Sequence, residues 1–128
     1  MDPNNAELRY NLGVIASESG EVEEAKAYYT KAIELNPKYI NAYINMAALV
    51  LGGEESLITE MNGLGSSKAD DKRYDELRGE RQELYKSAIP YLTKALEIDS
   101  KSLNAAKTLM NIAQSTSGSR MVLISHTN

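Results

Sequence analysis

Apolar residues recur at intervals of three and four in the first part of the chain, which is the spacing of one face of an α-helix. In the first such segment the face consists of Leu8, Leu12, Ile15 and Ala16. In the next it consists of Ala25, Tyr29, Ala32 and Ile33, before Asn36-Pro37 ends the pattern. Only the short polar stretch 18–20 separates the two segments, so the pattern predicts two antiparallel helices.

The second of these helices recurs later in the chain. When Ala25–Lys38 is laid over Ala88–Lys101 without a gap, half of the positions are identical. The identical pairs are Ala25/Ala88, Tyr28/Tyr91, Thr30/Thr93, Lys31/Lys94, Ala32/Ala95, Glu34/Glu97 and Lys38/Lys101. A match of this density indicates an internal repeat, in which small alanines let neighbouring helix backbones approach closely.

Residues 6–39 resemble one complete tetratricopeptide repeat (TPR), a helix pair of about 34 residues. The resemblance rests on residues at the signature spacing, namely Leu12-Gly13, Gly20, Ala25, Tyr29, Ala32 and Pro37. Arg9 departs from the family pattern, which usually has a large apolar residue there. The resemblance implies an all-α fold, a TPR-type α-solenoid of antiparallel helix pairs.

The motif also predicts how the rest of the chain is divided. The expected segments are the end of a preceding repeat or an N-terminal cap (1–5), a first repeat (6–39), a second repeat with an insertion at about 52–84 (40–102), the first helix of an incomplete third repeat (103–114) and a flexible or foreign tail (115–128). The tail contains the apolar run Met121–Ile124 and the only histidine, His126, which we expect to be inert.

The insertion has the pattern of two further helical stripes rather than of a loop. One consists of Leu57, Ile58, Met61 and Leu64, and the other of Tyr74, Leu77, Leu84, Ala88, Tyr91 and Ala95. The Gly- and Ser-rich stretch 62–67 between them predicts a turn. We therefore expect the second repeat to have elongated helices that form a helical-hairpin extension, disturbed at Gly52-Gly53. The insertion resembles that of a subgroup of bacterial TPR proteins, with Ala88–Leu92 as the shared segment.

Composition and charge exclude several classes of function. The chain has no cysteine and a net charge of −4 without a basic block, so we expect no thiolate chemistry, no cofactor, no metal and no nucleic-acid partner. No apolar run is long enough to span a membrane. The first residues lack the pattern of a signal peptide. We expect a soluble protein, with the cytoplasm favoured and the periplasm left open.

Nine residues are predicted to line the concave groove of the repeat array, because they occupy the groove positions of the TPR motif. They are Tyr10, Asn11, Val14, Asn41, Ile44, Asn45, Asn104, Lys107 and Asn111. Asparagine both donates and accepts hydrogen bonds, so a row of asparagines can hold a peptide backbone. The alternative is that asparagine is merely tolerated on an exposed face. Of the positions that bind a chaperone's C-terminal carboxylate in some TPR domains, only Asn45 matches, so that ligand is not expected.

These patterns favour a non-catalytic scaffold that binds a peptide or protein segment. The alternative is self-assembly into a homodimer through the helical extension or the terminal helix, on which Leu109 and Ile112 are expected to be partly exposed. An enzyme would have to act through carboxylates alone, and we therefore predict no catalytic residues.

Overall fold

The computed structural model describes residues 5–116, and within that range the chain forms six α-helices and no strand. The helices are α1 (Ala6–Glu18), α2 (Val22–Leu35), α3 (Ile40–Leu51), α4 (Glu54–Asn62), α5 (Lys68–Ile98) and α6 (Leu103–Thr116). The all-α prediction is therefore confirmed. The residues beyond this range include those expected to end a preceding repeat, the apolar run Met121–Ile124 and His126, and these predictions lie outside the described part of the chain.

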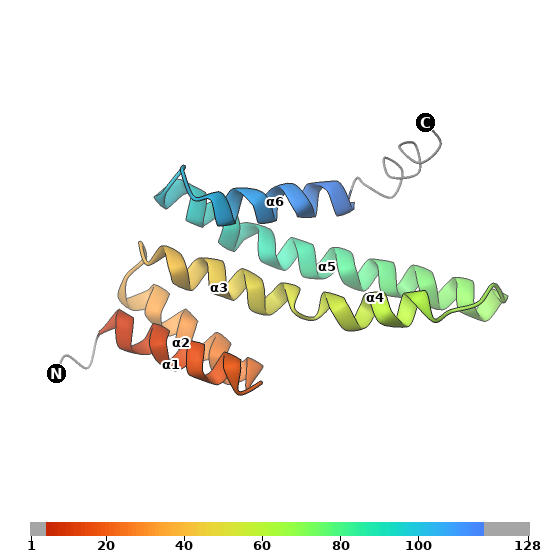
Figure 1. Ribbon diagram of the computed structural model, residues 1–128, viewed down its shortest axis with the longest axis horizontal. Helices are drawn as coiled ribbons and strands as arrows, with labels where there is room; N and C mark the ends of the chain where they lie inside the picture. The colour runs from red at the N-terminus through yellow and green to blue at the C-terminus, as the bar shows by residue number, and fades with distance from the viewer. Residues whose placement is uncertain (1–4, 117–128) are drawn as a thin grey trace.

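The helices stack in order along the molecule (Figure 1). Helix α1 packs on α2, α2 on α3, α3 on α5 and α5 on α6, so each layer contacts mainly its neighbours. This is the arrangement of a solenoid, in which stability comes from successive interfaces between neighbours. Helices α4 and α5 continue as a hairpin that projects beyond the ends of α1 and α2. None of the helices within residues 5–116 is long and apolar enough to cross a bilayer.

The two loops that follow α2 and α5 have the same geometry. The capping residues Asn36 and Asp99 have nearly equal backbone angles, with φ of −143° and −142°. Each side chain accepts a hydrogen bond from the backbone two residues on, at 3.1 Å from Lys38 and 3.0 Å from Lys101. Such turns are typical of Asn and Asp. The sequence repeat therefore corresponds to a repeated local structure.

Two hydrophobic clusters form the core. One lies between α3, α5 and α6 and is built from Tyr43, Ala47, Tyr85, Ala88, Leu92, Ala95, Ala105 and Ile112. The other lies between α1, α2 and α3 and is built from Ala16, Ala25, Tyr29 and Met46. Ile33 and Tyr91 pack against both clusters, so the core is continuous from α1 to α6.

Gly13 of α1 lies directly against the Tyr29 ring of α2. A methyl group at Gly13 would come within 2.6 Å of that ring, closer than carbon atoms can approach without displacement. Because Tyr29 is buried, its ring has little space in which to move. The glycine is thus required for the close approach of the two helices.

We predict that Gly13→Ala lowers the free energy of unfolding by about 1–2 kcal/mol, because the cost of overpacking exceeds the gain in helix propensity. Gly79→Ala is the matched control, since it lies in α5 and a methyl group there meets nothing within 4 Å. It should raise stability by about 0.5–1 kcal/mol. Urea unfolding followed by circular dichroism measures both. A Gly13→Ala variant as stable as the parent would contradict the packing described.

The insertion forms a helical hairpin with one interrupted arm. Helix α3 ends at Leu51 and α4 begins at Glu54, so the first arm breaks at the glycine pair. The second arm is the single 31-residue helix α5, which continues through Pro90. At 1.5 Å per residue α5 is about 45 Å long. Met61 of α4 and Leu77 of α5 are buried in the hairpin.

Four side chains lie differently from the sequence pattern. Tyr74 was expected in the α5 stripe but is 44% exposed, whereas Tyr85, which the stripe omitted, is buried. Ile112 was expected to be partly exposed but is only 4% exposed, because its side chain is part of the main cluster between α3, α5 and α6. Leu109 is partly buried against the same cluster, as predicted, whereas Ile15, expected on the packed face of α1, is 60% exposed. The apolar side chains that α6 does expose are Leu103 and Met110.

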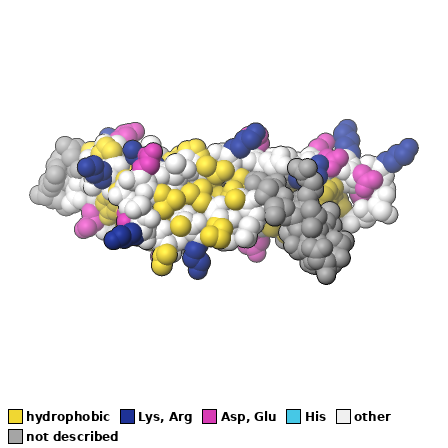
Figure 2. Space-filling view, turned by 90° about the horizontal axis from the view of Figure 1, so that it is seen from above, with side chains coloured by type: hydrophobic (Ala, Val, Ile, Leu, Met, Phe, Trp, Pro, Cys, Tyr) yellow, Lys and Arg dark blue, Asp and Glu magenta, His cyan; other side chains and the backbone are white. Residues whose placement is uncertain are grey.

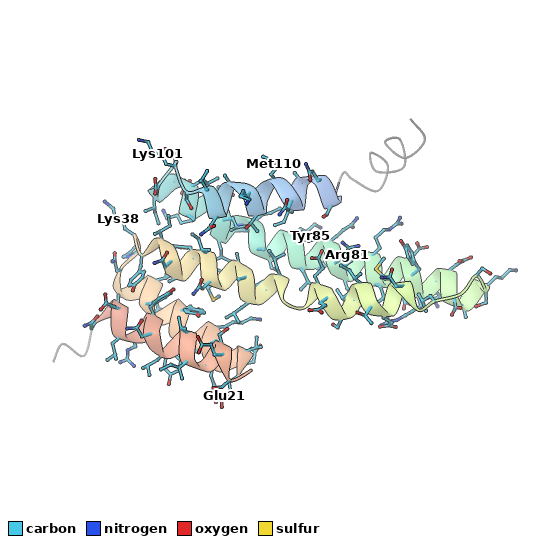
Figure 3. All side chains as sticks on the ribbon, in the orientation of Figure 1. Glu21, Lys38, Arg81, Tyr85, Lys101 and Met110 are labelled. Carbon is cyan, nitrogen blue, oxygen red and sulfur yellow. The ribbon has the colours of Figure 1, made fainter. Side chains whose placement is uncertain are left out.

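Charged side chains connect α4 to α5. Arg81 donates to the Glu54 carboxylate at 3.1 Å and to the Tyr85 hydroxyl at 2.9 Å (Figure 3). Nearer the tip, Arg73 donates to both carboxylate oxygens of Glu60, at 2.7 and 3.1 Å. The hydrogen bond from Arg73 lowers the pKa of Glu60. At pH values above the ordinary pKa of a glutamate, this pair therefore stabilises the hairpin fully. The contribution is lost as the pH falls through the lowered pKa of Glu60.

Candidate functional site

Asn45 is held in place where α1, α2 and α3 meet. Its Nδ2 donates to the Tyr10 hydroxyl at 3.0 Å and, more weakly, to the Tyr29 hydroxyl at 3.4 Å. These bonds fix the orientation of the amide, which is otherwise free to rotate by half a turn. The carbonyl oxygen Oδ1 makes no hydrogen bond to any residue within 5–116 and remains available as an acceptor.

The two tyrosines belong to a small aromatic cluster. The Tyr10 ring stacks on Tyr39 at a centroid distance of 5.1 Å and lies 5.7 Å from the Tyr29 ring. Burial raises the pKa of the Tyr29 hydroxyl, opposed in part by the hydrogen bond from Asn45. Burial also raises the pKa of Tyr39. Both hydroxyls therefore stay protonated at neutral pH and act as hydrogen-bonding groups rather than as bases.

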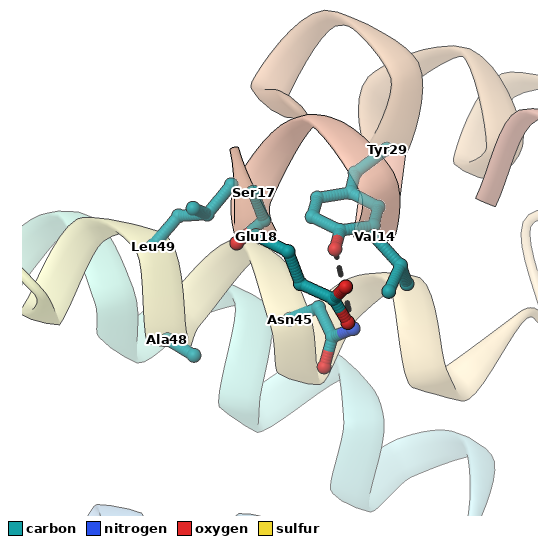
Figure 4. A pocket seen from close by; sticks show the side chains of 7 residues that line it. All are labelled: Val14, Ser17, Glu18, Tyr29, Asn45, Ala48 and Leu49. Carbon is teal, nitrogen blue, oxygen red and sulfur yellow. Dashed lines mark hydrogen bonds between the residues drawn. The ribbon is translucent and has the colours of Figure 1, made fainter. Parts of the chain in front are cut away.

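An open cleft of about 290 Å³ lies beside Asn45 (Figure 4). Its lining comes mostly from the end of α1 and the middle of α3, and α2 contributes Tyr29. It is lined by Val14, Ser17, Glu18, Tyr29, Asn45, Ala48 and Leu49. The lining thus combines apolar side chains, hydrogen-bonding groups and one carboxylate.

The structure brings together three of the nine predicted groove residues. Val14 and Asn45 line the cleft, and Tyr10 is hydrogen-bonded to Asn45. The remaining six do not line it. Asn11 and Asn41 are exposed, Ile44 packs partly buried against the main cluster, and the α6 residues Asn104, Lys107 and Asn111 are exposed along their own helix. The groove as a nine-residue surface stays a prediction.

Five lining residues were not among the predicted set, namely Ser17, Glu18, Tyr29, Ala48 and Leu49. Ser17 and Glu18 lie on the same face of α1 as Val14, three and four residues further on, so helical spacing could have identified them. Leu49 follows Asn45 by one helical turn on α3. Ser17, Glu18 and Leu49 occupy none of the groove positions of the motif but share a helix face with Val14 or Asn45.

Within residues 5–116, no group of three or more His, Cys, Asp or Glu side chains lies close enough together to hold a metal ion. The lining of the cleft offers a ligand hydrogen-bonding groups, apolar contact and one carboxylate.

Comparisons with known proteins agree with the helical arrangement. The family model described as "Tetratricopeptide repeat" matches residues 6–39. An uncharacterized protein of Methanocaldococcus jannaschii is 46% identical over 59 residues, which cover 43% of this chain and 69% of that protein. Photosystem I assembly protein Ycf3 of Cuscuta gronovii is 42% identical over 50 residues, covering 38% of this chain but only 30% of that protein.

Among solved structures, the first TPR of Spaghetti (RPAP3), bound to an HSP90 peptide, aligns with 92% of this chain and 98% of its own. The identity is 18% and the TM-score 0.40. The repeated helix pairs, the family match and the archaeal relative lead to one conclusion: the chain belongs to the tetratricopeptide repeat family.

Proposed function

We propose that this protein binds an extended segment of a partner protein in the groove formed by α1, α3 and α6. TPR proteins are generally interaction modules rather than catalysts, and their curved stacks offer concave surfaces for binding. The relative Ycf3 is named an assembly protein, which agrees with a role in holding other polypeptides. The nine predicted groove residues belong to this proposal.

The observation that carries the proposal is the fixed Asn45 amide beside the cleft. Two tyrosine hydroxyls hold Asn45, so its conformational entropy is already lost before a ligand arrives. A preorganised polar group binds more tightly than a mobile one. The unused Oδ1 can accept a backbone N–H, while Val14, Ala48 and Leu49 offer apolar contact. These features suit a peptide held by its backbone and by one side chain.

Photo-crosslinking in cells tests the proposal. A benzoylphenylalanine placed at Ala48, which is exposed in the cleft, or at Lys107 on α6 should form an adduct with a discrete partner. The same residue at Thr30, which is exposed on α2, is the matched control and should form none. Adducts of equal yield at all three positions, or only at Thr30, would contradict binding in the groove.

A second candidate function is self-assembly through the outer face of α6. Leu103 is 76% exposed and Met110 is 59% exposed. They are seven residues apart, which is two helical turns, so they lie on the same face of α6. Met110 points away from α5, and hydrophobic side chains gather at the centre of this face (Figures 2 and 3). Light scattering at increasing protein concentration tests self-assembly. If the parent chain forms a dimer, the double variant Leu103→Glu, Met110→Glu should abolish it. A parent chain that stays monomeric would exclude this candidate function.

A further inference from the structure

We infer that the cleft between α1 and α3 binds the cationic side chain of a lysine or arginine in the partner segment. This inference rests on the proposed function, because it specifies the chemistry of the partner that the groove would hold. It depends on the charge, the contacts and the shape of the cleft lining.

Glu18 carries the only formal charge in the cleft lining. Its carboxylate has no salt bridge and no hydrogen bond with any residue within 5–116. Several other carboxylates in the described chain are paired, as Glu54 is with Arg81 and Glu60 with Arg73. An unpaired carboxylate beside fixed hydrogen-bonding groups attracts a cation and repels an acidic side chain.

The position of Glu18 on its helix strengthens this charge. It is the last residue of α1, and the last turn contains no basic residue. The C-terminal end of a helix carries a partial negative charge, so a carboxylate there is locally unfavourable. A carboxylate at the negative end of a helix, with no cation beside it, is an unfavourable local arrangement of the kind expected at functional sites. A bound cation would offset both the carboxylate and the helix end.

The rest of the lining fits the shape of a long basic side chain. Val14, Ala48 and Leu49 can contact its methylene groups. The Ser17 hydroxyl and the Oδ1 atom of Asn45 are acceptors for its N–H groups. The tyrosine hydroxyls keep the Nδ2 of Asn45 turned toward themselves, which leaves the oxygen for the ligand.

A second cleft, along α4, has the same sign of charge. It has a volume of about 520 Å³ and is lined by Gly52, Glu55, Ser56, Thr59 and Glu60. Glu60 is paired with Arg73, but Glu55 has no such partner within residues 5–116. Neither cleft is lined by Lys or Arg, so both favour a basic ligand.

The test uses a phage-displayed library of random 12-residue peptides, panned on the whole chain. We expect the selected peptides to be enriched several-fold in lysine or arginine at one position. In fluorescence polarisation, Glu18→Gln should weaken a selected peptide about fivefold, as should norleucine in place of its basic residue. Glu83→Gln, a change of an exposed glutamate on α5, is the matched control and should leave the affinity unchanged. Panning on Glu18→Lys should select acidic residues at that position instead.

The outcomes separate this inference from the proposed function. The variant Ala48→Trp fills the cleft from an exposed position and reports binding in the groove. If Ala48→Trp abolishes binding but Glu18→Gln does not weaken it, or the peptides are not enriched in basic residues, the cation inference is wrong and the groove proposal stands. Peptides that bind Ala48→Trp as well as the parent, or the absence of any enriched peptide, would overturn both.

Discussion

Replacing Tyr29 by alanine should lower the free energy of unfolding by about 3–5 kcal/mol. The side chain is only 2% exposed and is among the largest that are fully buried. Its ring fills the space against Gly13 and packs with Ala16, Ala25 and Met46. The substitution leaves a cavity that α1 cannot close without moving, and the loss is therefore that of a core aromatic residue. Chemical denaturation followed by circular dichroism measures it.

The matched variant Tyr29→Phe keeps the ring and removes only the hydroxyl. Because that hydroxyl accepts a long bond of 3.4 Å from Asn45, the loss should be at most about 1 kcal/mol. If Phe and Ala at this position were equally destabilising, the ring would not be the main contribution. If neither were destabilising, the packing of α1 on α2 would be wrong.

Replacing Leu77 by alanine should cost about 2–5 kcal/mol, and the effect should be concentrated in the hairpin. Leu77 is completely buried between α4 and α5. The hairpin projects beyond α1 and α2, so these helices do not depend on it directly. In a stack of neighbours such a local loss opens the affected region first. Hydrogen exchange should therefore accelerate over 54–84 and stay nearly unchanged over 6–35.

Tyr74→Ala is the matched control for this prediction. Tyr74 lies on the same helix one turn earlier but is 44% exposed, so its removal should change stability by less than about 0.5 kcal/mol. Exchange that accelerated uniformly along the chain in Leu77→Ala would mean that the hairpin and the repeats unfold as one unit, contrary to the layered arrangement.

The helix pairs could be predicted from sequence because their packing is local and periodic. The positions of Gly13, Ala25 and Ala32 fix how closely two helices approach, and this spacing is visible without coordinates. The turns after α2 and α5 are also predictable from the sequence. Asn36 and Asp99 form the same turn, because each side chain accepts a hydrogen bond from the backbone two residues on.

The hairpin was less predictable because periodicity does not say which face of a helix the partner covers. A near-heptad stripe placed Tyr74 inside and left out Tyr85, whereas the partner helix covers the face that carries Tyr85. Its burial also depends on the contact with Arg81, which no spacing rule indicates. The same limit applies to Ile112, whose burial is decided by the packing of α6 on α5 and on the main cluster.

The candidate site was predictable only in part. Asn45 was found because its position in the motif is known, but its fixation by Tyr10 and Tyr29 needs three helices to meet. Glu18 was missed because a charged residue at a helix end resembles ordinary solvated surface. Only the three-dimensional structure shows that this carboxylate lies beside Asn45 in the lining of the cleft (Figure 4).

The central claim is that a partner segment lies in the groove beside Asn45, and chemical-shift mapping tests it most directly. A peptide from the selection is titrated into the isotope-labelled chain, and the shifts of all amide groups are followed. We predict that the largest changes fall on the side-chain amide of Asn45 and on the backbone of residues 14–18 and 45–49. Changes confined to the outer face of α6, around Leu103 and Met110, would contradict the claim.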